Sequence, residues 1–144
     1  MTTRSRRLTG AALVVYLLAV ARVTLWPEPA PDDTFDIVRA VLDWLDAHGI
    51  PLSYAGLESA ANVVMFVPFG ILVGLLLPRR PPWTVIALGA GTSVAIELAQ
   101  LAFLPSRVSD PRDVVANTLG AAVGVGLLRL WTARTTTAVE VPAP

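Results

Sequence analysis

The hydrophobic pattern of the chain is dominated by four long apolar stretches, separated by shorter polar segments. These stretches are residues 8–25, 59–77, 83–104 and 114–131. Each is close to the ~20 apolar residues that an α-helix needs to cross ~30 Å of hydrocarbon. The pattern therefore predicts an all-α integral membrane protein, a four-helix bundle. We expect a single transmembrane domain over residues 1–134 and a disordered tail over residues 135–144.

Polar residues interrupt the apolar stretches at one depth. If the helices cross the bilayer alternately, the same half of the membrane contains Arg22, Asn62, Glu97, Gln100 and Asn117. Amide and ionisable side chains are costly in hydrocarbon, so a group of them at one level needs partners, water or a function. Glu97 is the costliest, because a carboxylate at this depth either keeps its proton or takes an arginine as partner.

The spacing of these polar residues places them in pairs on helix faces. Glu97 and Gln100 are three residues apart, and Asp113 and Asn117 are four residues apart, so each pair faces one neighbour. Glu58 precedes Asn62 by the same helical spacing. The polar turn between the third and fourth stretches closes over this level. The predicted polar site therefore comprises Arg22, Asn62, Glu97, Gln100, Arg107, Asp110, Asp113 and Asn117.

The arginines predict the orientation of the chain. One side of the membrane carries Arg4, Arg6, Arg7, Arg79, Arg80, Arg129 and Arg134. The opposite side has only Arg39, Arg107 and Arg112. The positive-inside rule then places both termini in the cytoplasm and the polar layer in the outer half of the bilayer. We expect the first stretch to be an uncleaved helix rather than a signal peptide, because its apolar run extends to Trp26.

The segment between the first two stretches has the pattern of an amphipathic helix. Apolar residues recur at helical spacing from Phe35 to Leu45, and aspartates occupy the other face. We expect this external helix to lie on the outer membrane surface with Trp44 near the lipid head groups.

Glycine pairs predict close contacts between the spanning helices. Gly70 and Gly74 form one small-xxx-small pair, and Gly120 and Gly124 form another. Gly89 and Gly91 are further candidates in the third stretch. Together the pairs favour a compact bundle.

Composition excludes several classes of function. The chain has no cysteine, a net charge of zero and no basic block, so thiolate chemistry and nucleic-acid binding are excluded. His48 is the only histidine, which excludes phosphatases that need two. No nucleotide-binding or serine-hydrolase motif is present. We expect no cofactor and no metal, although Glu97, Asp110 and Asp113 could supply oxygen ligands for Mg²⁺ or Ca²⁺.

The polar residues resemble a known family. The run from Asn62 to Gly70, the segment Glu97 to Gln100, and the spaced residues from Arg107 to Gly124 are similar to the VanZ-like membrane proteins. The residues that carry the resemblance are Asn62, Pro68, Gly70, Glu97, Gln100, Arg107, Asp113, Asn117 and Gly120. The resemblance implies a multi-pass protein of the bacterial cell membrane, in a family whose named member is associated with teicoplanin resistance. It implies no reaction.

Two hypotheses of function follow. In the first, the polar site recognises the head group of an envelope lipid or lipid-linked precursor: Arg22 and Arg107 contact phosphate or carboxylate, while Glu97 orients the head group or exchanges a proton. In the second, the protein is a non-catalytic scaffold whose polar layer only fixes helix packing and which binds a membrane protein partner. Whether the chain is an enzyme, and its oligomeric state, stay open.

Overall fold

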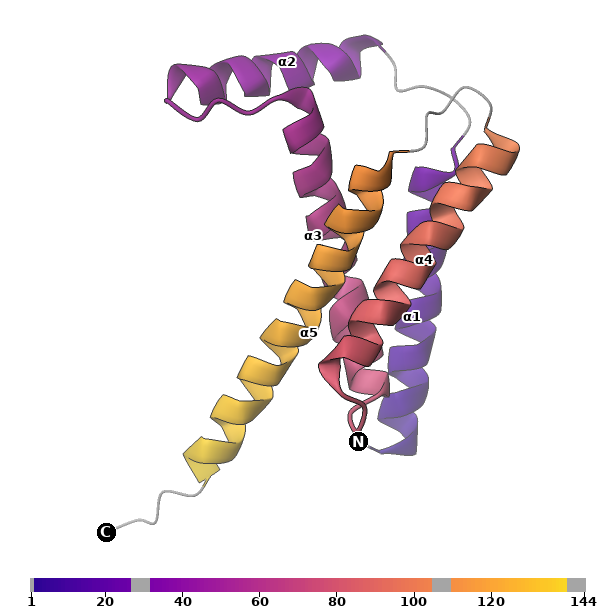
Figure 1. Ribbon diagram of the computed structural model, residues 1–144. Helices are drawn as coiled ribbons and strands as arrows, with labels where there is room; N and C mark the ends of the chain where they lie inside the picture. The colour runs from indigo at the N-terminus through magenta and orange to yellow at the C-terminus, as the bar shows by residue number, and fades with distance from the viewer. Residues whose placement is uncertain (1, 27–31, 105–109, 140–144) are drawn as a thin grey trace.

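The described residues form five α-helices and no strand (Figure 1). The computed structural model describes residues 2–26, 32–104 and 110–139. The helices are α1 (Thr3–Thr24), α2 (Asp32–Ala47), α3 (Tyr54–Leu76), α4 (Pro82–Phe103) and α5 (Pro111–Val139). Helices α1, α3 and α4, and residues Pro111–Thr135 of α5, are long and apolar enough to cross a membrane. The prediction of an all-α bundle with four spanning helices is confirmed.

Capping residues, rather than hydropathy, decide where the helices begin. The Ser53 side chain accepts a hydrogen bond from the Gly56 amide (3.1 Å), so α3 begins at Tyr54, before its apolar stretch. Pro82 occupies the first turn of α4, where the missing amide hydrogen costs nothing. Helix α5 extends to Val139, so residues 135–139 of the predicted tail are helical, and residues 140–144 lie outside the described part.

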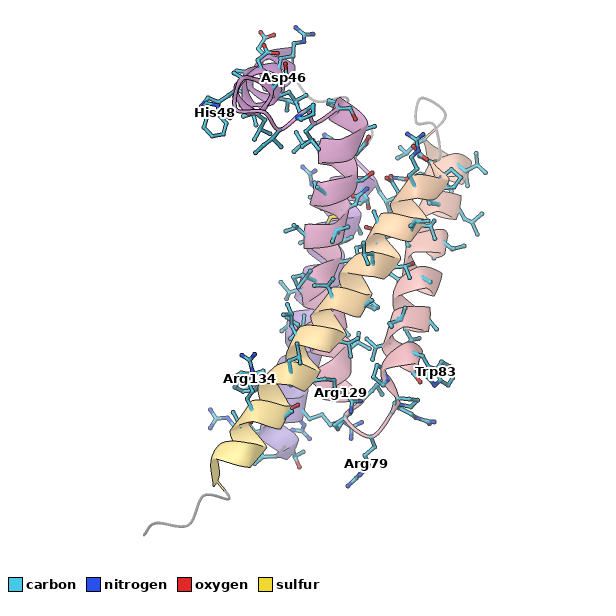
Figure 2. All side chains as sticks on the ribbon, turned by 60° about the vertical axis from the view of Figure 1, so that its left-hand side comes forward. Asp46, His48, Arg79, Trp83, Arg129 and Arg134 are labelled. Carbon is cyan, nitrogen blue, oxygen red and sulfur yellow. The ribbon has the colours of Figure 1, made fainter. Side chains whose placement is uncertain are left out.

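Helix α2 lies across one end of the bundle, while the other four helices run alongside one another (Figure 1). The expected amphipathic helix is therefore present, and Ile37, Val41 and Trp44 are exposed on it. Figure 2 shows Asp46 on the side of α2 that faces away from the bundle. This leaves apolar side chains for the membrane surface, where the sequence predicts that α2 lies.

The two ends of the bundle differ in charge. Helix α1 begins, α3 ends and α5 ends at the pole opposite α2, and Figure 2 shows Arg79, Arg129 and Arg134 there. We call this pole the arginine end and the other pole the α2 end. The four tryptophans of the chain are all exposed and lie near the two ends of the bundle. Trp26 and Trp44 lie near the α2 end, and Trp83 and Trp131 lie toward the arginine end. Such a distribution is typical of aromatic belts at the two membrane surfaces.

Glycines bring α3 and α5 into backbone contact. A Cβ added at Gly70 would collide with the Ala121 carbonyl oxygen, one at Gly120 with that of Val63, and one at Gly124 with that of Val67. The predicted glycine contact between these helices is confirmed. Gly91, by contrast, has no atom within 4 Å of an added Cβ, so its predicted packing role is wrong. The close crossing of α3 and α5 places the polar residues of the two helices side by side.

Candidate functional site

Polar side chains gather inside the bundle in its half nearer α2. Helix α4 presents Ser93, Glu97 and Gln100 on one face, and their exposed fractions are 0%, 8% and 8%. Asn117 of α5 is 4% exposed, and Asn62 of α3 and Asp113 of α5 are partly buried. We call these six residues the polar layer: Asn62, Ser93, Glu97, Gln100, Asp113 and Asn117.

Two hydrogen bonds of the polar layer join α5 to its neighbours. Asn62 Nδ2 donates to Asp113 Oδ1 over 2.7 Å, which links α3 to α5. Asn117 Nδ2 donates to Ser93 Oγ over 2.8 Å, which links α5 to α4. Because Asp113 and Asn117 are one helical turn apart, the two bonds reach different partners from the same side of α5.

Two further bonds attach α1 to the bundle through backbone carbonyls. Gln100 Nε2 donates to the carbonyl oxygen of Thr24 (2.9 Å), the last residue of α1, where a carbonyl has no helical partner. Tyr16 Oη donates to the carbonyl of Met65 over 2.8 Å. The four bonds form a closed cycle, α1 to α3 to α5 to α4 and back to α1, so each spanning helix is attached to two others.

One acceptor in the polar layer has no partner. The side-chain oxygen Oδ1 of Asn117 is buried and accepts no hydrogen bond within the described residues. A buried acceptor left in this state costs about 1–3 kcal/mol. Its position therefore favours a hydrogen-bond donor from beyond the described residues, such as water or a ligand group.

The polar layer is also strongly acidic. Glu58, Glu97 and Asp110 are near enough to Asp113 for their negative charges to repel its carboxylate, and among the described side chains the Asn62 amide gives it a compensating hydrogen bond. This concentration of acceptors and negative charge favours ligand groups that donate hydrogen bonds or carry positive charge. Among the residues described, no group of three or more His, Asp or Glu is arranged to hold a metal ion.

Three of the predicted site residues are not part of this layer. Arg22 is exposed, and its guanidinium lies 3.2 Å from the centroid of the Trp26 ring, so the pair faces outward at the end of α1. Asp110 accepts a hydrogen bond from the Arg112 amide over 2.9 Å and so caps α5. Arg107 lies outside the described residues.

Four participants in the hydrogen-bond cycle were missed by sequence reasoning: Tyr16, Thr24, Met65 and Ser93. Ser93 had a detectable signal, because it precedes Glu97 by four residues and so shares its helix face. Thr24 and Met65 contribute only backbone carbonyls. No side-chain pattern can reveal those two.

An apolar groove follows the α3–α5 crossing beside the polar layer. Its volume is about 490 Å³, and its lining consists of Ser59, Ala60, Val63, Pro111, Arg112, Val115, Ala116 and Leu119. Val63 and Arg112 adjoin Asn62 and Asp113 in sequence, so the groove flanks the hydrogen bond between those two residues. Apart from Ser59 and Arg112 the lining is apolar. This suits a ligand with a hydrocarbon chain and a negatively charged group near Arg112.

The fold and this site define a multi-pass helical membrane protein with a polar layer buried between its spanning helices. The sequence profile of the VanZ/LLP1 family matches residues 13–132, most of the chain, and the protein belongs to this family. The match includes α2 and the second half of α1, beyond the segment that carries the sequence resemblance. Comparisons with curated proteins and with solved structures give no match.

A double-mutant cycle tests the bond between Asn117 and Ser93. We expect Asn117→Ala and Ser93→Ala to be coupled by about 0.6 kcal/mol, the average for interhelical hydrogen bonds in membranes. The measurement is reversible unfolding in SDS–detergent mixtures for the wild type, both single variants and the double variant. Strictly additive losses would show that the bond adds no stability.

Proposed function

We propose that this protein recognises the head group of an envelope lipid, or of a lipid-linked envelope precursor, in the outer leaflet of the bacterial cell membrane. The orientation follows from the positive-inside rule, which puts the arginine end in the cytoplasm and the α2 end outside. The observation that carries the proposal is the groove between α3 and α5, which flanks a polar layer containing an acceptor without a partner among the described residues.

The groove and Arg112 together suit an amphiphile. An acyl or prenyl chain would lie along Val63, Val115 and Leu119, and the phosphate next to it would meet the Arg112 guanidinium at the outer end of α5. Arg22, stacked on Trp26, would supply a second cation at the same surface. In this assignment Arg112 takes the phosphate role that was predicted for Arg107.

The polar layer would select what lies beyond the phosphate. Asn117 Oδ1 and the carboxylates of Glu97 and Asp113 are acceptors, so a hydroxyl, amide N–H or amine of the head group would be favoured over an additional anion. Sugars, peptides and ethanolamine carry such donors. A protein that holds a lipid-linked precursor in this way would alter the access of glycopeptides to it, which is our proposal for the family's link with teicoplanin resistance.

The second candidate function is a scaffold without a ligand. The observation that favours it is the closed hydrogen-bond cycle, which attaches all four spanning helices to one another. The two functions differ in what co-purifies with the protein in mild detergent. A lipid of one head-group class supports recognition, whereas a stoichiometric protein partner supports the scaffold.

A matched pair of arginine variants tests the phosphate role of Arg112. We expect Arg112→Gln to reduce the amount of co-purifying envelope lipid about fivefold, because one arginine near the membrane surface contributes about 1 kcal/mol to binding of an anionic lipid. The measurement is quantitative lipid mass spectrometry of the purified protein. Arg39→Gln is the control, since Arg39 is an exposed arginine on α2, paired with Asp36 and distant in sequence from the groove. Equal effects of the two changes would exclude a specific role for Arg112.

A further inference from the structure

A second cavity lies at the arginine end, far from the polar layer. Its volume is about 480 Å³, and its lining consists of Arg6, Leu75, Leu76, Leu77, Pro78, Arg79 and Arg80. Its lining therefore comes from the first turns of α1, the end of α3 and the turn before α4. We call it the arginine cavity. Neither the polar layer nor the groove includes any of these residues.

No acidic residue in the described part of the chain is paired with the arginines of this cavity. The parts of the chain nearest it, residues 2–27 and 59–96, contain no aspartate or glutamate, and neither do residues 114–139. Among the described residues, Arg6, Arg79 and Arg80 form no salt bridge. An anion from outside the described residues is therefore a natural counter-charge for the three arginines that line the cavity.

The turn that carries two of these arginines is held in place. Arg129 of α5 donates from Nη2 to the carbonyl oxygen of Arg80 over 2.6 Å, and the Arg80 amide donates to the carbonyl of Leu77 over 3.0 Å. Pro78, Pro81 and Pro82 restrict the backbone on both sides. Figure 2 shows Arg79 and Arg129 at this end, with Trp83 nearby. The positive-inside rule requires only that arginines lie on this side of the membrane. It does not require a fixed turn or a cavity lined by those arginines.

We propose that the arginine cavity binds the phosphate head group of an anionic phospholipid of the cytoplasmic leaflet. Arg6, Arg79 and Arg80 would surround the phosphate, and Leu75 to Leu77 would contact the first methylenes of the acyl chain. The site depends on the arginine-end orientation and not on the outer-leaflet function. The same lining favours a head group of net negative charge over a zwitterionic one, whose ammonium would be repelled by the arginines.

Two charge-matched triple variants of the full chain in nanodiscs test this site. The cavity variant carries Arg6→Gln, Arg79→Gln and Arg80→Gln, and the control variant carries Arg4→Gln, Arg7→Gln and Arg134→Gln. Both lose three positive charges from the same end, but only the first loses lining residues. Native mass spectrometry measures bound phosphatidylglycerol against phosphatidylethanolamine, with glycerol phosphate added as a soluble competitor.

We expect the cavity variant to lose bound phosphatidylglycerol at least about tenfold more than the control variant, because three arginines act on one phosphate. Equal losses would overturn the proposal in favour of a diffuse surface attraction. Displacement by glycerol phosphate would overturn the lipid assignment in favour of a soluble phosphate ligand. Arg79→Gln alone, at an exposed turn residue, should lower binding about fivefold with the fold intact, and no change would contradict the site.

Loss of orientation is separated from loss of binding by labelling. The chain has no cysteine, so Thr2→Cys introduced into each variant gives a single thiol for a membrane-impermeant maleimide. In intact cells Thr2→Cys should be protected in the wild type and in both triple variants. Labelling of the wild-type background would place the arginine end outside and overturn the assignment to the cytoplasmic leaflet.

Discussion

Gly124→Ala is expected to destabilise the bundle by about 1–3 kcal/mol, the usual cost of overpacking a close contact. The added methyl would collide with the Val67 carbonyl oxygen and would lie 3.0 Å from the Cα of Gly70 and 3.1 Å from the Ile71 amide nitrogen. All three are backbone atoms, so no side-chain rotation relieves the clash. Helices α3 and α5 must move apart, and the bond between Asn62 and Asp113 is then stretched.

Gly126→Ala is the matched control for this prediction. Gly126 lies two residues further along α5, and an added Cβ there has no atom within 4 Å. Alanine is a better helix former than glycine by up to ~1 kcal/mol, so this change should be neutral or stabilising. Reversible unfolding in SDS–detergent mixtures measures both variants. Equal stability of the two would contradict the backbone contact between α3 and α5.

The second large effect is expected from filling the groove. The bilayer around a lipid tail is as apolar as the groove. Binding of an acyl chain in the groove therefore depends on shape rather than on the hydrophobic effect. Ala60→Trp would place a large ring in the groove and remove this fit. We expect the lipid retained per protein after purification to fall about tenfold, equivalent to about 1.4 kcal/mol.

Ala61→Trp controls for the bulk of the new side chain. Ala60 and Ala61 are neighbours on α3 and both are exposed, but only Ala60 lines the groove. Ala61→Trp should therefore retain lipid at the wild-type level. If both variants retain it equally, the lipid does not occupy the groove. Unfolding midpoints for the two variants would confirm that each keeps the bundle intact.

Much of the fold could be predicted because the bilayer imposes it. Backbone groups in hydrocarbon must bond internally, so apolar stretches of sufficient length become helices, and the arginine distribution suggests their direction. Gly70, Gly120 and Gly124 could be placed at contacts because small residues at that spacing form a flat helix surface. Gly91 fails because spacing alone does not say which face meets a neighbour.

The site could be predicted only in part. Asn62, Glu97, Gln100, Asp113 and Asn117 share a depth, and the structure brings them into one layer. Arg22 shares the depth but not the direction: its face of α1 points outward, where the guanidinium stacks on Trp26. The carbonyls of Thr24 and Met65 carry no side-chain signal. The groove was not predictable, because its walls are ordinary apolar residues and only the α3–α5 crossing creates it.

The most direct test of lipid recognition is photo-cross-linking from within the groove in living cells. A photoreactive amino acid replaces Val115, which lines the groove, or Val123, an exposed residue on α5 outside it. We expect adducts at position 115 to be enriched in one envelope lipid or lipid-linked precursor, while adducts at position 123 mirror the bulk membrane. Bulk composition at both positions would contradict lipid recognition by the groove.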